Sequence, residues 1–218
     1  MFSYVIEHME EDDVDTPRAI PPWVELEYAH MRTLAGPSAH VHFTHLSTAS
    51  SNSLSTVFVP ADGLADASCY QKGVLDLIQE RLGEDAIGKV CLLDPKAEKE
   101  LAPEDGDGRF EWFLFGGILG DDPPRDRTSE LRVLGFPTRH LGPVQMTTDT
   151  ALGVTKKVVH DKIPLDAIPY INFPTIRFNA KESVEMPFRY IADEKNEPIL
   201  PPGMRKLLHE DLNKSFEF

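Results

Sequence analysis

The residues best suited to chemistry follow an apolar run near the middle of the chain. Residues 110–128 read F-E-W-F-L-F-G-G-I-L-G-D-D-P-P-R-D-R-T, so glycines, paired carboxylates and arginines come directly after a strand-like stretch. Glycines let the backbone approach a ligand closely because no side chain intervenes. Carboxylates can hold a cation or accept a proton from it. The alternative is a tight turn that only connects a core strand to the next helix.

A second group of carboxylates follows the first strand of the chain. The apolar residues 2–6 predict a strand, and this strand runs into Glu7 and an acidic segment that includes Glu10. Ligands of open α/β sheets bind outside the carboxyl ends of parallel strands, so these carboxylates are candidates for a cation site. A solvated acidic loop is the simpler interpretation of the same residues.

A third polar loop precedes a helix in the second half of the chain. The segment Q-M-T-T-D-T-A at 145–151 gives Thr147 or Thr148 as the N-cap of this helix. Asp149 then lies in the first turn, where the helix dipole favours negative charge. A well-capped ordinary helix explains these residues too, but not why a second polar strand-end loop follows the first so closely.

Two other patches allow a functional and a structural interpretation. The segment E-M-P-F-R-Y at 185–190 joins the carboxylate of Glu185 to a proline and aromatic side chains, which suits either binding or packing. His40, His42 and His45 lie in or after a strand over 39–43, where alternate side chains share one face. No carboxylate or cysteine stands at a matching spacing, so we expect exposed histidines and no metal site.

The elements that must position these residues alternate between strands and helices. This alternation predicts an α/β fold with a largely parallel sheet. Strands are expected over 2–6, 39–43, 89–93, 110–115 and 139–141, and helices over 23–36, 71–83, 129–134 and 147–160. The Ser- and Thr-rich residues 44–60 are expected to form a flexible surface insertion, and the acidic residues 96–108 a solvated helix and loop. Prolines after residue 164 predict short extended pieces, followed by a helix over 202–214.

Composition limits the classes of function. The chain has 218 residues, 41% of them hydrophobic and 27% charged, which is ordinary for one globular domain with a small extension. The formal net charge of -14 disfavours binding to nucleic acid and favours a basic partner. Cys69 and Cys91 fit neither a disulfide framework nor a zinc site. With no signal sequence and no membrane-length apolar run, we expect a soluble cytoplasmic protein.

The three motifs F-G-G-I-L-G-D-D-P-P-R-D-R-T, Q-M-T-T-D-T-A and E-M-P-F-R-Y resemble the fungal SPOUT-class protein arginine methyltransferase family, which modifies a small-subunit ribosomal protein. The resemblance runs from Y-V-I-E-H-M-E-E to P-I-L-P-P-G-M and breaks at 44–60. It implies a SPOUT methyltransferase domain over 1–163, with a trefoil knot over about 88–163. Residues 164–218 would then form a Pro-rich C-terminal extension packed on that domain.

The resemblance also implies S-adenosylmethionine as the cofactor. Three loops would supply its binding residues: Leu93, Asp94, Phe115, Gly116, Gly117, Ile118, Leu119, Gly120, Met146, Thr147 and Thr148. We assign Asp121 and Glu7 to gripping and deprotonating the guanidinium, with Asp149 as the alternative base. Arg125 would pair with a loop carboxylate or the cofactor carboxylate, and Arg127 would be structural.

The expected substrate is a basic small-subunit ribosomal protein. Four further residues would contact it: Glu10, Asp122, Glu185 and Arg189. Two alternative functions remain. The first is an RNA methyltransferase, the usual activity of the SPOUT class, although this sequence has no basic stripe. The second is a cofactor-binding module of ribosome biogenesis that does not catalyse a reaction. The extension is expected to cover the usual SPOUT dimer face, which predicts a monomer.

Overall fold

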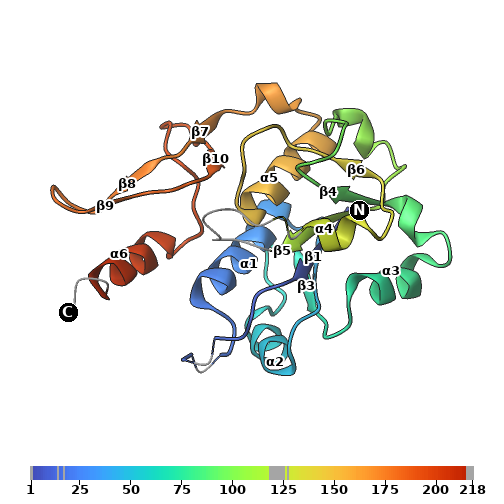
Figure 1. Cartoon of the computed structure of the whole chain (residues 1–218), viewed down its shortest axis with the longest axis horizontal. Helices are drawn as coiled ribbons and strands as arrows, with labels where there is room; N and C mark the ends of the chain where they lie inside the picture. Colours follow the sequence, from blue (N-terminus) through green and yellow to red (C-terminus); the bar gives the residue numbers. More distant parts are fainter. Residues whose placement is uncertain (1, 14, 17, 118–125, 127, 215–218) are drawn as a thin grey trace.

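A single parallel sheet forms the centre of the protein (Figure 1). The computed structural model describes residues 2–13, 15–16, 18–117, 126 and 128–214. Within these residues the sheet has six strands in the order β3-β2-β1-β5-β4-β6, and every neighbouring pair is parallel. The strands are β1 (Ser3–His8), β2 (His40–Thr44), β3 (Asp66–Cys69), β4 (Val90–Leu93), β5 (Trp112–Gly117) and β6 (Thr138–Arg139).

Helices cover both faces of the sheet because the strands are apolar on both sides. In β1, Tyr4 and Ile6 point into one hydrophobic cluster, whereas Val5 points into the other. The first cluster includes side chains of α1 (Pro22–Ala35), α2 (Thr48–Val57) and α5 (Thr148–Val159); the second includes those of α3 (Val74–Leu82) and α4 (Thr128–Arg132). None of the helices in the described ranges is both long and apolar enough to cross a lipid bilayer.

The Ser- and Thr-rich segment is not a flexible insertion but mostly a helix, which corrects the sequence-based expectation. The Ser47 side chain caps α2 by accepting a hydrogen bond from the Ser50 backbone N–H at 3.0 Å. Ser50, Ser51 and Leu54 are buried against the domain. Serine is common at helix N-caps, so the composition that suggested a loop also supplied the start of this helix.

The acidic segment 96–108 is also less exposed than expected. It contains a short 3₁₀ helix, Pro103–Gly106, in which Asp105 is only 4% exposed. Two nitrogens of the Arg139 guanidinium donate to the two oxygens of Asp105, and both hydrogen bonds are 2.9 Å long. This bidentate ion pair connects the acidic segment to β6.

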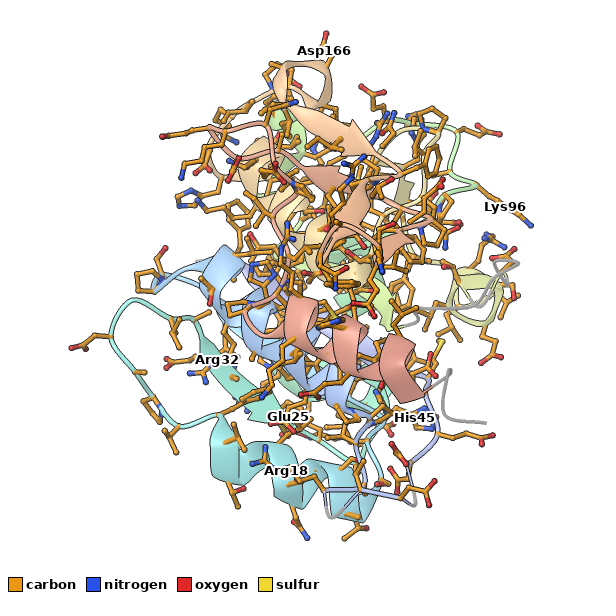
Figure 2. The ribbon with its side chains drawn as sticks, turned by 90° about the vertical axis from the view of Figure 1, so that its left-hand side faces the viewer. Arg18, Glu25, Arg32, His45, Lys96 and Asp166 are labelled. Atoms are coloured by element: carbon orange, nitrogen blue, oxygen red, sulfur yellow. The ribbon has the colours of Figure 1, made fainter. Side chains whose placement is uncertain are left out.

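The C-terminal part of the chain forms a separate small layer. Its strands pair antiparallel as β7 (Tyr170–Asn172) with β10 (Arg189–Ile191) and β8 (Thr175–Arg177) with β9 (Ser183–Glu185). Helix α6 (Met204–Lys214) follows. β10 contacts α5 and α6 contacts α1, so this layer lies beside the two helices that cover the first face (Figure 1). Figure 2, seen from that side, shows α6 in front of α1.

Gly117, the last residue of β5, requires the absence of a side chain. A Cβ atom there would come within 2.7 Å of Ile6 Cγ2 and 2.8 Å of the Glu7 carbonyl oxygen. These atoms belong to β1, the neighbouring strand in register. Glycine therefore allows the two central strands to remain paired up to their carboxyl ends.

We predict that Gly117→Ala lowers the free energy of unfolding by about 1–3 kcal/mol, because a methyl group would overpack the β1–β5 contact. Gly88→Ala is the matched control, since a Cβ at this glycine meets nothing within 4 Å. Its effect should stay within about 0.5 kcal/mol. Urea unfolding of both variants measures the difference, and equal losses would contradict the steric explanation.

Candidate functional site

A cavity of about 370 Å³ opens at the carboxyl ends of β4 and β5. We call it the strand-end cavity. This volume lies in the usual range for small-molecule sites, and the position is the one where open α/β sheets bind ligands. Its walls are residues 93–96, 115–116, 126, 128, 141–146, 148 and 151. The parallel sheet thus brings three loops, far apart in sequence, to one edge.

Most of the predicted cofactor-binding residues that the structure describes line this cavity: Leu93, Asp94, Phe115, Gly116, Met146 and Thr148. Thr147 lines a different cavity on the other side of the first turn of α5. Gly117 lies against β1, as described above. Ile118, Leu119 and Gly120 lie outside the described residues. The sequence prediction missed residues 141–144, which directly precede the recognised motif, and Gln145, its first residue.

An ion-pair network fixes the wall of the strand-end cavity at β4. Asp94 is 2% exposed and accepts hydrogen bonds from Arg132 Nε at 2.5 Å and Arg132 Nη2 at 2.7 Å. Arg132 also donates to Asp126, which Lys96 approaches to 2.6 Å. Hydrogen bonds from Arg132 and Lys96 lower the pKa of Asp126 to about 2. Asp94 and Asp126 are therefore ion-paired, and these pairs stabilise the cavity wall.

The Glu7 side chain is hydrogen-bonded to neighbouring elements of the fold. Glu7 is 8% exposed. Its carboxylate accepts a hydrogen bond from the Val74 backbone N–H at 2.9 Å and another from the Thr44 hydroxyl. Val74 begins α3, whose N-cap Gly73 has no side chain, so Glu7 satisfies a free N–H group of that helix. Burial raises the pKa of Glu7. Among the described residues, Glu7 lines neither cavity, so this geometry does not favour it as the base.

Asp149 lies in the first turn of α5 and is 1% exposed. Its Oδ2 atom is 2.7 Å from His30 Nδ1 of α1. Its Oδ1 atom is buried and has no hydrogen-bond partner among the described residues. Asp149 thus offers one oxygen to a ligand from a fully buried position.

A second carboxylate, Glu27 of α1, lies beside Asp149. Glu27 is 5% exposed, and its Oε2 atom likewise has no hydrogen-bond partner within the described ranges. Burial, followed by the nearby charges of Asp149 and Glu10, raises the pKa of Glu27 well above its ordinary value. The sequence prediction missed Glu27. The signal was present, because Trp23, Glu27 and His30 recur at helical spacing and place a carboxylate on a face that packs inward.

Glu27 and Asp149 line a second cavity of about 220 Å³, which we call the α6 cavity. Its other walls come from α1, the start of α5, β10 with the residues before it, and α6: Trp23, Thr147, Met186, Phe188, Tyr190, Leu200, Pro201, Met204, Leu207, Leu208 and Asp211. The two cavities share no wall residue, and Thr147, Thr148 and Asp149 face them alternately. The first turn of α5 is therefore their common wall.

The other predicted site residues are spread over the molecule. Glu10 is half-buried and close enough to Glu27 to raise its pKa. Glu185 is exposed in β9 and lines neither cavity. Asp121, Asp122, Arg125 and Arg127 lie outside the described residues.

Arg189 connects the C-terminal layer to the strand-end cavity, which is a different task from the substrate contact assigned to it. Its backbone N–H donates to the Gln145 carbonyl at 2.8 Å. Its guanidinium donates from Nε to Asn172 Oδ1 at 2.7 Å and lies 4.6 Å from the centre of the Tyr170 ring. The partners that surround its side chain thus come from β7.

The histidines of β2 are stacked on other rings. The ring centroids of His40 and His42 are 4.2 Å apart, and His42 lies 4.5 Å from the Trp112 ring. Burial lowers the pKa of His42 to about 3. His40 is half-buried and His42 buried, so the expectation that both are exposed is wrong. Within the described residues, no three or more His, Cys, Asp or Glu side chains lie together where they could hold a metal ion.

The fold and its cavities define a class of protein. A parallel α/β sheet with a ligand-sized cavity outside its strand ends, walled by a glycine and three loops, is typical of cofactor-binding α/β enzymes. A family model described as "Protein arginine N-methyltransferase SFM1-like" matches residues 3–215. The chain therefore belongs to the SFM1-like family of protein arginine N-methyltransferases.

Individual relatives agree with this assignment. The chain is 39% identical over 219 residues to protein arginine N-methyltransferase SFM1 of Saccharomyces cerevisiae, covering 98% of this chain and 97% of the relative. The crystal structure of yeast SFM1 complexed with SAM matches with a TM-score of 0.80 at 36% identity, covering 96% of this chain and 91% of that one. The complex with SAH matches at 0.76 and 36%, covering 94% of each.

These matches confirm the resemblance stated from the sequence and the SPOUT fold class that it implies. The trefoil knot over 88–163 and the division of the chain at residue 163 stay predictions.

We predict that Arg132→Ala lowers the free energy of unfolding by about 1–3 kcal/mol, because it leaves the buried Asp94 carboxylate without its cation. It should also weaken binding of S-adenosylhomocysteine, because Asp94, Lys96 and Asp126 line the strand-end cavity. Urea unfolding and calorimetric titration measure the two effects. Arg81→Ala, at an exposed position of α3, is the control and should leave ligand affinity unchanged. Unaltered affinity in Arg132→Ala would show that the network does not shape the cavity.

We also predict that Glu27→Gln stabilises the protein, and more so as pH rises. The folded-state pKa of Glu27 lies above its ordinary value of 4.5. The contribution of the protonated Glu27 side chain to the free energy of unfolding is therefore complete below about pH 4.5. This contribution is lost as pH rises through the folded-state pKa, because the buried carboxylate must then ionise. The gain of the variant over the parent should reach about 1–3 kcal/mol.

Urea unfolding at about pH 5 and about pH 8 measures this difference. Glu84→Gln removes the same charge from an exposed turn and should change stability by less than about 0.5 kcal/mol at both pH values. A Glu27→Gln variant that loses stability at the higher pH would mean that the carboxylate has a stabilising partner.

Proposed function

We propose that this chain transfers a methyl group from S-adenosylmethionine to a guanidinium nitrogen of an arginine in a basic protein of the small ribosomal subunit. The observation that carries the proposal is the strand-end cavity, which six of the residues predicted to bind the cofactor line. Family membership gives the class of reaction. The acidic character of the chain supports a basic protein as the substrate.

The residues of the strand-end cavity fit this cofactor. Leu93, Phe115 and Met146 supply apolar walls for a flat aromatic base. Gly116 brings bare backbone to the cavity, so peptide N–H and C=O groups can contact the ligand directly. Lys96, at the outer edge of the protein in Figure 2, is 65% exposed, and its ammonium, one N–H of which is paired with Asp126, has further N–H donors at the rim. A carboxylate-bearing ligand suits such a rim.

When bound, S-adenosylmethionine supplies an electrophilic methyl group on a sulfonium centre. The task of the protein is then to orient one guanidinium nitrogen and to remove its proton. Deprotonating an arginine at pH 7 before transfer would cost roughly 8 kcal/mol, because the pKa of its guanidinium lies far above neutrality. A positioned carboxylate avoids most of this cost by taking the proton as the new N–C bond forms.

Asp149 is the base that the geometry favours. Its Oδ1 atom is free among the described residues, while His30 holds Oδ2 and so fixes the orientation of the carboxylate. Glu7, by contrast, lines neither cavity. Asp121 stays a prediction from the sequence. The cytoplasmic location and the monomeric state also stay predictions.

The test is methyl transfer from radiolabelled S-adenosylmethionine to ribosomal fractions. We expect the label in a small-subunit protein, released as methylarginine on hydrolysis. Label in RNA with a steep dependence on salt would instead support the RNA methyltransferase alternative. Binding of S-adenosylmethionine without transfer to any fraction would support the non-catalytic alternative.

We predict that Asp149→Asn lowers kcat by about 10²–10⁴-fold, because it removes the proton acceptor and preserves the shape of the side chain. Binding of S-adenosylhomocysteine should stay within about twofold of the parent, since the carboxylate faces the other cavity. Glu84→Gln is again the control for loss of one negative charge. A parental kcat in Asp149→Asn would remove Asp149 from the proposed mechanism.

A further inference from the structure

The α6 cavity contains two buried carboxylates that have unused hydrogen-bonding capacity. Glu27 and Asp149 are 5% and 1% exposed, and each has one oxygen without a hydrogen-bond partner among the described residues. Buried carboxylate oxygens are costly unless a donor satisfies them. The charges that act on Glu27 are those of Asp149 and Glu10, which are of the same sign. The cavity is therefore built to receive a cation or a strong hydrogen-bond donor.

The shape and lining of the cavity indicate what kind of cation. Its volume of about 220 Å³ is far larger than the space that one water molecule needs. Apolar side chains of α6 and the segment before it, Leu200, Met204 and Leu207 among them, form one wall. A ligand with an aliphatic stem and a charged end fits such a cavity, because the stem contacts the apolar wall while the end reaches the carboxylates.

The aromatic residues favour a planar cation. Trp23, Phe188 and Tyr190 all line the cavity. Guanidinium groups stack on aromatic faces and donate to carboxylates through several N–H groups held in one plane. Two carboxylates that come from different helices, α1 and α5, can accept from different edges of such a group. An arginine side chain meets all of these conditions.

We infer that the α6 cavity receives the arginine side chain that is to be methylated, with Glu27 and Asp149 as its guanidinium-binding residues. The inference rests on the proposed function for the identity of the reaction. The arginine enters from the side of α6, and its guanidinium stops at the first turn of α5. That turn also borders the strand-end cavity, so a guanidinium nitrogen at its edge can meet the methyl carbon of the cofactor.

The chemistry at this position balances with one carboxylate as the proton acceptor. A guanidinium nitrogen forms the bond to the methyl carbon, the bond from that carbon to sulfur breaks, and its electron pair stays on sulfur. The nitrogen gives its proton to Asp149 Oδ1, and Glu27 keeps the positively charged product in place. Glu27 is thus a substrate-binding residue, and it is absent from the set of residues predicted from the sequence.

The direct test uses n-butylguanidinium, which reproduces an arginine side chain, and follows the NMR signal of the Trp23 indole N–H. We expect a saturable shift in the parent protein and at least tenfold weaker binding in Glu27→Gln. Glu84→Gln should bind as the parent does. The neutral isostere n-butylurea should bind at least tenfold more weakly than n-butylguanidinium. Equal binding to the parent and Glu27→Gln would overturn the inference.

A second variant tests the cavity from its opposite wall. Leu207→Trp leaves both carboxylates in place and fills the space in front of them, so it should also abolish the shift. In methyl-transfer assays both variants should raise KM for the protein substrate at least tenfold and leave binding of S-adenosylhomocysteine unchanged. A parental KM in both variants would overturn the inference even if methylation occurs.

The two proposals can fail separately. Binding of n-butylguanidinium that depends on Glu27, without methyl transfer to any protein, would support the cavity as an arginine site and contradict the proposed reaction. Methyl transfer to arginine that is indifferent to Glu27→Gln and Leu207→Trp would support the reaction and contradict the cavity as its substrate site.

Discussion

The contact between His30 and Asp149 is the interaction on which the rest of the site depends. It joins α1 to the first turn of α5 through a 2.7 Å hydrogen bond between two residues that are 5% and 1% exposed. Because this turn is the common wall of both cavities, its position sets the distance between anything bound in one and anything bound in the other. The same contact holds one oxygen of Asp149 and leaves the second for a ligand. A buried carboxylate with one unpaired oxygen indicates a site that binds a ligand.

The parallel sheet supplies the second condition, which is that loops distant in sequence end at one edge. β4 and β5 are neighbours and place Leu93 and Phe115 side by side at their carboxyl ends. Arg132 then fixes Asp94 and Asp126 in the cavity wall. On the opposite side of α5, the C-terminal layer adds β10 and α6, and these complete the α6 cavity. This layer has a definite task, since without it Glu27 and Asp149 would lose the apolar wall in front of them.

Much of this arrangement could be predicted from the sequence, for physical reasons. Continuous apolar runs identified β1, β4 and β5, helical spacing identified α1, α3 and α5, and their alternation gave the parallel α/β sheet. The strand β3, D-A-S-C, was missed because it is short and polar at an edge of the sheet. Glu27 was missed because a carboxylate on an amphipathic helix is usually solvated, although this one shares a helical face with Trp23 and His30. Glu7 was placed correctly at the end of β1, but its hydrogen bonds from Val74 and Thr44 depend on tertiary contacts that the sequence does not show, and its catalytic assignment stays a prediction.

We propose that the cofactor and the arginine that receives its methyl group meet at the edge of the first turn of α5, which borders both cavities. A crystal structure of the protein with S-adenosylhomocysteine and n-butylguanidinium tests this most directly. We expect S-adenosylhomocysteine in the strand-end cavity, and the guanidinium group within hydrogen-bonding distance of Glu27 and Asp149, with its nearest nitrogen facing the sulfur atom. A guanidinium group bound at other carboxylates while the α6 cavity holds none, or a sulfur atom that faces away from the first turn of α5, would contradict it.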